Sequence, residues 1–371
     1  MLSYNLNDNA NVNRDFLRLV RLGIGHSAEP LGNPVDWNAI EALAAKQGLL
    51  GVVLDGEEVL CTNVNLNHNL NMPDKLFRLE WLGKVMLEEE RYALQKKASV
   101  EMASLFASNG IRTYVLKGMV VSECYPKPQH RVSADVDCFL LPDKGDEDVW
   151  EKGNQLMEEA GYKVGRGFYK NSSFSLPGLT VENHRFMVPF RGNNCLRRLE
   201  ATLQSMLKSD NGKGRFEDTL LYRPPVMVSA LFLIEHAYSH FLHEGLTWRH
   251  VLDWMMFSRK HKEEIDWQAL NAMIDEFGFR KFYDSYNRLG QYLVGEIQDS
   301  SFTIQDRRML DDVWAPLDLQ EDLHSLKAKI GMARATIRAR WKYRYFSPIS
   351  MPYALWIQVK GFLFDKNPTL D

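Results

Sequence analysis

Cysteine is scarce in this chain of 371 residues, and charge of neither sign dominates it. The cysteines stand far apart and form no Cys-x-x-Cys pair, which disfavours a disulfide framework and a cysteine zinc site (Cys61, Cys124, Cys138 and Cys195). Lys and Arg number 45 against 48 Asp and Glu, a net charge of −3. No global positive field therefore favours nucleic acid as a partner, although a local basic patch stays open.

Long apolar runs and several common catalytic signatures are also absent. The longest apolar run, Val226–Ile234, contains Ser229 and is much shorter than the ~18 residues of a transmembrane helix. No Gly-x-Ser-x-Gly, Gly-x-Gly-x-x-Gly or Walker sequence occurs, so the usual hydrolase, dinucleotide-binding and P-loop signatures are missing. The first residues have neither a basic start nor an apolar stretch. We therefore expect no secretory signal and a soluble, cytoplasmic protein.

Helical periodicity is typical of both ends of the chain. The length predicts two domains, or one large fold with helical additions. Asp36 is expected to start a helix near Trp37, and Asn at every second position from 63 to 71 predicts a loop. Apolar spacing predicts further helices, the last of them basic, at 73–108, 226–243, 246–259, 267–277, 282–293, 306–314 and 323–345.

A β-rich segment lies between the helical ends. Strands are expected at 111–116 and 134–141, followed by a hairpin of 168–176 and 179–188 that turns at Pro177-Gly178. A helix is expected at 145–161, with Asp146 and Glu147 in its first turn. We therefore divide the chain into a helical region 1–100, a mixed core 101–200 and a helical region 201–371.

Asp135 and Asp137 carry the clearest chemical signal. In a strand, side chains two residues apart point to the same face, with their stems about 6.6 Å apart. That separation suits a pair of metal ions ~3.5–4 Å apart, as in phosphoryl-transfer sites. The alternative is an exposed strand end on which water solvates both acids.

The neighbouring segments favour the metal site. Lys117-Gly118 follows a predicted strand and precedes a short predicted helix, where a glycine lets a phosphate approach the backbone and a lysine supplies charge. Downstream, Glu182 and His184 lie two apart in the predicted hairpin and therefore share a face.

The order of these motifs resembles the uncharacterised nucleotidyltransferase family of the DNA polymerase β-like superfamily. The similarity covers roughly residues 105–257. Besides the residues above, it includes Tyr125-Pro126, Arg131, and a histidine pair, His236 and His240, that precedes Leu252-Asp253. The resemblance implies an α+β protein whose region 101–200 is a nucleotidyltransferase core. It also implies transfer of a nucleoside monophosphate from a nucleoside triphosphate such as ATP, with Mg²⁺ or Mn²⁺, to an unknown small-molecule or protein acceptor.

The resemblance also implies a role for each residue. Asp135 and Asp137 would hold the metals, and Glu182 would be the third ligand and help deprotonate the acceptor hydroxyl. The nucleotide and its phosphates would lie against Lys117, Gly118, Arg131 and His184. We expect cleft contacts from the later helices at His236, His240 and Asp253.

Other interpretations of these residues stay open. Met119 stands where relatives favour Ser or Gly, and Glu182 where distant relatives carry Asp, so a catalytically weakened nucleotide-binding or regulatory module is the alternative. A helical interaction protein with a structural Asp pair is a third. His236 and His240 have helical spacing that suits zinc, but a polar contact between His240 and Asp253, or simple packing, is favoured over zinc.

Overall fold

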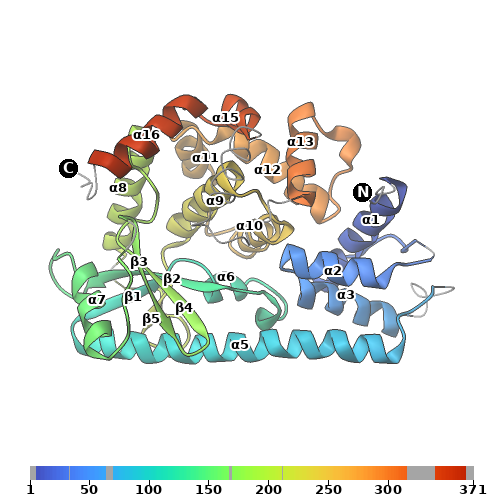
Figure 1. The fold of residues 1–371 in the computed structure, drawn as a ribbon, viewed down its shortest axis with the longest axis horizontal. Helices are drawn as coiled ribbons and strands as arrows, with labels where there is room; N and C mark the ends of the chain where they lie inside the picture. Colours follow the sequence, from blue (N-terminus) through green and yellow to red (C-terminus); the bar gives the residue numbers. More distant parts are fainter. Residues whose placement is uncertain are drawn as a thin grey trace.

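One long helix connects the parts of the molecule. In the computed structural model, which describes residues 6–32, 34–63, 70–166, 169–210, 212–315 and 339–364, α5 (Lys75–Ser108) passes beneath both the amino-terminal helices and the sheet (Figure 1). The Asp74 carboxylate accepts the Phe77 N–H at its start, and Asn109 caps its end. The predicted helix 73–108 is therefore confirmed, and it continues past residue 100.

Three helices form the amino-terminal part: α1 (Leu6–Gly23), α2 (Trp37–Gln47) and α3 (Leu50–Thr62). The Asp36 side chain accepts the Ala39 N–H and begins α2, as predicted. Residues 64–69 of the predicted asparagine loop lie outside the described residues. Asn71 from the same loop exchanges two hydrogen bonds with the backbone of Val35.

The described strands form one mixed five-stranded sheet in the order β3-β4-β2-β1-β5. Its central strands, β1 (Ile111–Val115) and β2 (Asp135–Pro142), are antiparallel. The predicted hairpin is present as β3 (Asn171–Leu176) and β4 (Leu179–His184), although Phe168 lies outside the described residues. β4 also pairs in parallel with β2, and β5 (Leu221–Tyr222) with β1, two pairings that the sequence did not predict.

Each face of the sheet has its own apolar core. Val136, Cys138 and Leu140 of β2 pack with α5 side chains such as Phe106. The alternate side chain Phe139 belongs to a larger core that includes the carboxy-terminal helices. Because side chains alternate along a strand, the odd-numbered residues of β2 point toward those helices.

Four helices connect or flank the strands of the sheet. They are α6 (Met119–Ser122), η1 (Pro128–His130), α7 (Trp150–Glu159) and α8 (Asn194–Ser209). The helix expected from 145 was placed too early, so Asp146 and Glu147 lie outside its first turn. Asp148 instead accepts the Trp150 N–H at the true start, and Glu151 is the acid in the first turn.

The carboxy-terminal helices cover the Phe139 face of the sheet. The described ones are α9 (Val226–His243), α10 (Trp248–Lys260), α11 (Trp267–Glu276), α12 (Arg280–Leu293), η2 (Asp299–Ser301), α13 (Ile304–Trp314), α15 (Arg340–Phe346) and α16 (Met351–Phe364). Most of the predicted basic helix, 323–338, lies outside the described residues. None of the helices in the described ranges is long and apolar enough to cross a membrane.

The architecture is the predicted α+β one, a small mixed sheet with helices before and after it. The large apolar core continues from the amino-terminal helices through the Phe139 face to the carboxy-terminal helices. The division into 1–100, 101–200 and 201–371 stays a prediction.

Candidate active site

Adjacent parallel strands bring the predicted acids together. In the β2–β4 pairing, Asp137 lies directly opposite Glu182, and Asp135 lies opposite Thr180. Opposed residues of paired strands point to the same face, so Asp135, Asp137 and Glu182 converge on the side of α9 and α10. Asp137 is almost fully buried, with 2% of its side chain exposed, whereas 30% of Asp135 and 34% of Glu182 is exposed. The acids therefore line an accessible site with Asp137 at its base.

Lys117 reaches this site from the turn after β1. Its Nζ lies 3.1 Å from Asp137 Oδ2, 3.8 Å from Asp135 Oδ1 and 3.1 Å from His236 Nε2. Burial and the charge of Asp137 raise the pKa of Asp135. Burial also acts to raise the pKa of Asp137, but the Lys117 ammonium and a hydrogen bond from His184 lower it well below its ordinary value.

His184 lies between two of the carboxylates. Its Nε2 is 2.9 Å from Asp137 Oδ1 and 3.4 Å from Glu182 Oε2, while its Nδ1 is 3.2 Å from the Phe186 carbonyl. Both ring nitrogens thus face oxygens that only accept hydrogen bonds. Burial acts to lower the pKa of His184, but the bonds to Asp137 and Glu182 raise it overall, and the same imidazolium lowers the pKa of Glu182.

The three acids are suited to a divalent cation, whereas both ring nitrogens of His184 face acceptor oxygens and so offer no lone pair to a metal. Asp137 Oδ2 is buried and receives no hydrogen bond from any described residue, because its contact with Lys117 is an ion pair without hydrogen-bond geometry. One ligand atom each from Asp137, Glu182 and His184 lies within 4.8 Å of the others. Carboxylate oxygens are the ligands that Mg²⁺ and Mn²⁺ prefer, and a cation would relieve the repulsion among the acids.

The turn at Gly118 requires glycine. Its φ is +72°, and a Cβ there would lie 3.2 Å from Ser133 Oγ. The Ser122 hydroxyl donates to the Gly118 carbonyl, and Met119 is buried in the apolar core beneath the sheet. Ser122 and Met119 therefore leave no side-chain hydroxyl for a phosphate at this turn.

Arg131 and Asp253 connect the sheet region to α10. The Arg131 guanidinium donates to both oxygens of Asp253, from Nε at 3.0 Å and from Nη2 at 2.7 Å, and the Tyr125 hydroxyl donates to Oδ1 at 2.7 Å. The expected contact between His240 and Asp253 is therefore wrong, because Arg131 and Tyr125 occupy that carboxylate. His240 Nδ1 instead lies 2.9 Å from Glu244 Oε2.

A third histidine, His250, joins the predicted pair. Ligand atoms of His236, His240 and His250 lie within 4.8 Å of one another, which is the geometry of a metal cluster. However, the Thr247 backbone N–H donates to His250 Nδ1, so the proton of a neutral His250 is on Nε2 and neither nitrogen has a free lone pair. The Lys117 ammonium also faces His236 Nε2. Both contacts oppose a metal here.

No pattern in the sequence pointed to His250 as a site residue. It lies on a different helix from His236 and His240, and only the packing of α9 against α10 brings its ring 4.7 Å from that of His240. Burial lowers the pKa of His236 and of His250 well below the ordinary value, with a further contribution from nearby positive charge. Both rings are therefore neutral at physiological pH.

Comparison with known proteins gives one match. Residues 33–295, more than half of the chain, match a family described as "Uncharacterised nucleotidyltransferase". The matched segment includes both strands that carry the acids as well as α9 and α10. No curated protein and no solved structure matches the chain.

Proposed function

Because the chain belongs to the uncharacterised nucleotidyltransferase family, we propose that it transfers a nucleoside monophosphate from a nucleoside triphosphate to a hydroxyl of a small molecule or a protein, with pyrophosphate as the leaving group. One observation carries the proposal: Asp135, Asp137 and Glu182 converge from two parallel strands around a buried carboxylate oxygen that receives no hydrogen bond from the described residues. Acids in that arrangement serve phosphoryl transfer, which depends mainly on positioning and charge stabilisation.

Each acid has a role in this proposal. Asp135 and Asp137 would hold Mg²⁺ or Mn²⁺, and Glu182 would share the cation and take the proton of the acceptor hydroxyl. The bound cation supplies positive charge that stabilises the transferring phosphoryl group and the attacking oxygen. Glu182 is suited to proton transfer because a third of its side chain is exposed, so that an acceptor can reach it.

The basic residues position these groups. His184 holds Asp137 and Glu182 in a fixed relation through Nε2, which keeps both carboxylates ionised. Lys117 forms ion pairs with Asp135 and Asp137 but no hydrogen bond to Asp137, so its ammonium would be available to a phosphate oxygen if the acids held a cation. Gly118 lets the phosphates approach that turn, whereas the charge of Arg131 is already paired with Asp253.

The experiment is a transfer assay with nucleotides labelled at the α-phosphate. Each of the four ribonucleoside triphosphates, with ATP first, is incubated with the protein, Mg²⁺ and cell extract as the source of acceptor. We expect one nucleotide to label an acceptor with wild-type protein, and Asp137→Asn to abolish labelling. Asp146→Asn is the matched control, because that carboxylate is exposed and lies outside the site.

A catalytically weakened nucleotide-binding module is the second candidate. The observation that favours it is the buried Met119 at the phosphate turn, which offers no hydroxyl. This candidate predicts that nucleotide and Mg²⁺ raise the melting temperature of wild-type protein while no acceptor is labelled and no pyrophosphate is released.

A further inference from the structure

The β3–β4 hairpin extends the surface of the sheet on which the acids lie. Phe174 and Leu176 of β3 pack into the apolar core that the sheet shares with α5. The alternate residues Ser173 and Ser175 therefore lie on the opposite face, which is the face of Glu182. Both serines are exposed. The open part of this face thus presents hydroxyl groups next to the most accessible end of the acid cluster.

Ser173 lies directly across from Glu182 in the hairpin. The N–H and the C=O of Ser173 both bond with Gly165, on the side away from β4. Ser173 and Glu182 are therefore a non-hydrogen-bonded pair, the type in which opposed side chains lie closest. The Cβ atoms of such cross-strand pairs are about 4.5–5.5 Å apart, so the serine hydroxyl lies beside the carboxylate of Glu182.

The hydroxyl and the carboxylate are both accessible. The Ser172 hydroxyl, on the buried face, donates to Asn154, but none of the described residues forms a hydrogen bond with the Ser173 hydroxyl. The missing side chain at Gly165 leaves this hydroxyl open, because a Cβ there would lie 3.3 Å from Ser173 Oγ. His184 contacts Glu182 through Oε2, and a third of the Glu182 side chain is exposed. Glu182 can therefore accept a proton from Ser173.

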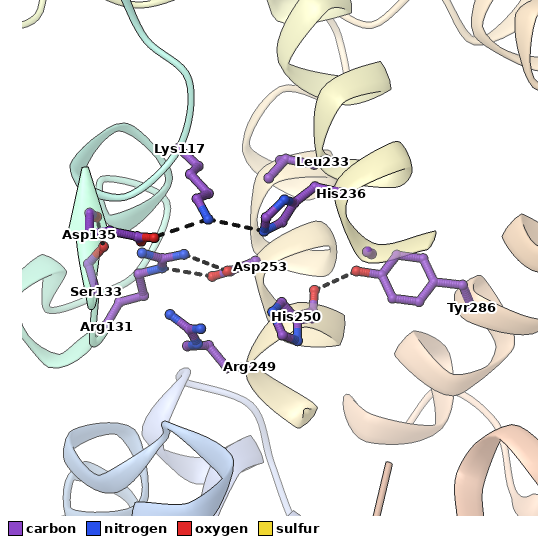
Figure 2. A pocket seen from close by; sticks show the side chains of 11 residues that line it. Lys117, Arg131, Ser133, Asp135, Leu233, His236, Arg249, His250, Asp253 and Tyr286 are labelled. Atoms are coloured by element: carbon purple, nitrogen blue, oxygen red, sulfur yellow. Dashed lines mark hydrogen bonds and ion pairs between the residues drawn. The ribbon is translucent and has the colours of Figure 1, made fainter. Parts of the chain in front are cut away.

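The other side of the acids is closed to an acceptor. A small pocket lies beside Asp135, between the sheet region and the helices α9 and α10 (Figure 2). Its volume is about 20 Å³, which is enough for one or two water molecules only. Cationic and histidine side chains occupy most of this side, namely Lys117, Arg131, His236, Arg249 and His250. An acceptor hydroxyl therefore approaches Glu182 from the side of the hairpin, where Ser173 already lies.

We propose that Ser173 is a nucleotidylation site, so that the protein transfers a nucleoside monophosphate to a serine of its own chain. The inference rests on the proposed function, which supplies the nucleoside triphosphate. Ser173 Oγ attacks the α-phosphorus and forms an O–P bond. The bond from that phosphorus to the oxygen that bridges to the β-phosphate breaks, and pyrophosphate leaves. Glu182 takes the hydroxyl proton, and the product is a phosphodiester between Ser173 and the nucleoside.

The position of Ser173 limits the extent of the reaction and its kinetic order. The attached nucleotide lies beside Glu182, where a second acceptor hydroxyl would have to enter. The reaction therefore ends at one nucleotide per chain. Because Ser173 and Glu182 belong to one hairpin, the step is intramolecular, and its rate constant does not depend on the protein concentration.

The test uses purified wild-type protein, Mg²⁺ and each α-labelled ribonucleoside triphosphate, without cell extract. We expect the intact mass to increase by one nucleoside monophosphate, with an equal amount of pyrophosphate released. Trypsin cleavage after Lys170 and Arg185 releases the peptide 171–185, and its fragmentation should assign the modification to Ser173. The initial rate per chain should be the same over a wide range of protein concentration.

Variants identify the acceptor. Ser173→Ala should abolish the label, whereas Ser173→Thr should retain it because threonine also has a hydroxyl. Ser175→Ala is the matched control, because Ser175 is exposed on the same face of the same strand but lies across from Thr180, and it should be labelled as the wild type is. The melting temperature of all three should equal that of the wild type, because both side chains are exposed.

Three results would overturn the inference: no label on purified wild-type protein, label that persists in Ser173→Ala, or label on a different residue of the chain. Label that persists in Asp137→Asn would also reject it, because that transfer would not use the acid cluster. A parallel reaction of wild-type protein with cell extract separates this inference from the proposed function. Label on an acceptor from the extract, with none on the chain, would reject Ser173 alone, whereas no label on either would reject both.

Discussion

Glu182 lies on a different strand from the two aspartates, and it is as exposed as Asp135 whereas Asp137 is buried. Its carboxylate is held by His184, and its pKa is below the ordinary value because of that hydrogen bond. The side chain is therefore an ionised base next to the place where an acceptor would enter. Under the proposed function, Glu182 is the acid that takes the proton of the acceptor hydroxyl, whereas Asp135 and Asp137 hold the cation.

Glu182→Gln should lower kcat by about 10²–10⁴-fold, because the amide cannot take a proton from the acceptor hydroxyl. The KM for the nucleotide should change little, since Asp135 and Asp137 remain. Steady-state kinetics with the acceptor found in the labelling screen measures both constants, with the exposed Glu159→Gln as control. An unchanged kcat would remove Glu182 from the mechanism.

Predictions for single residues were correct where they depended only on the two-residue repeat of side chains along one strand. The two-residue period of a strand correctly aligned Asp135 with Asp137, and Glu182 with His184. It could not provide the partner of Asp253, or the presence of Arg249 and His250 at the pocket, because those contacts cross between separate elements. The predicted contact between His240 and Asp253 was wrong for the same reason, because these residues lie on two separate helices.

At the scale of elements, two glycines allow α1 and α3 to touch through their backbones. A Cβ on Gly56 would lie 2.1 Å from the Leu19 carbonyl oxygen, and one on Gly23 would lie 1.9 Å from the Val52 carbonyl oxygen. Backbone atoms cannot move aside as a flexible side chain can, so both positions exclude any larger residue.

Gly56→Ala should therefore reduce the free energy of unfolding by about 1–3 kcal/mol, the typical cost of overpacking. Gly83→Ala should increase it by about 0.5–1 kcal/mol, because alanine is the better helix former and a Cβ at Gly83 meets no atom within 4 Å. Urea denaturation measures both changes. If Gly56→Ala were as stable as the wild type, the close packing of α1 on α3 would be wrong.

His130 connects three elements through its ring. Its Nδ1 lies 2.8 Å from Asp55 Oδ2 on α3, and its Nε2 lies 2.9 Å from Glu89 Oε1 on α5, while the residue itself ends η1. Burial acts to lower the pKa of His130, but the bonds to Asp55 and Glu89 raise it overall. The imidazolium therefore stabilises the contact of η1 with both helices.

A histidine whose pKa is higher in the folded state stabilises the protein below its unfolded pKa of about 6.5, and this contribution is lost as the pH rises through the folded pKa. The melting temperature of wild type should thus exceed that of His130→Gln by several degrees at pH 6, and the difference should shrink toward pH 9. His261→Gln is the control, because its partner Glu264 is in the same turn. An equal difference at every pH would exclude a charged His130.

Whether a helix or strand was predicted correctly depended on the length of its segment. The long helices α5, α9 and α10 were predicted to within about two residues, because their apolar spacing repeats over several turns. The two-residue strand β5 was missed because it is too short to show a period. The start of α7 was misplaced because Asp146 and Glu147 resemble a first helical turn, whereas the chain bends at Gly145 and has no regular structure from 146 to 149.

At the scale of the whole molecule, the site is built from both halves of the matched family segment. β2 and β4 supply the acids, whereas α9 and α10 supply His236, Arg249 and Asp253. The sequence predicted a cleft between these parts but not its charges, because the helix packing that closes it depends on contacts between distant residues. The ion pair between Arg131 and Asp253 joins the sheet region to α10. These two residues therefore contribute both to the candidate site and to the packing of the helices against the sheet region.

The labelling assay with all four α-labelled ribonucleoside triphosphates tests the proposed transfer most directly. Wild-type protein and Asp146→Asn should label an acceptor in the presence of Mg²⁺ or Mn²⁺, and EDTA or Asp137→Asn should abolish the signal. Labelling that persists in Asp137→Asn, or that is absent from wild-type protein with every nucleotide, would contradict it.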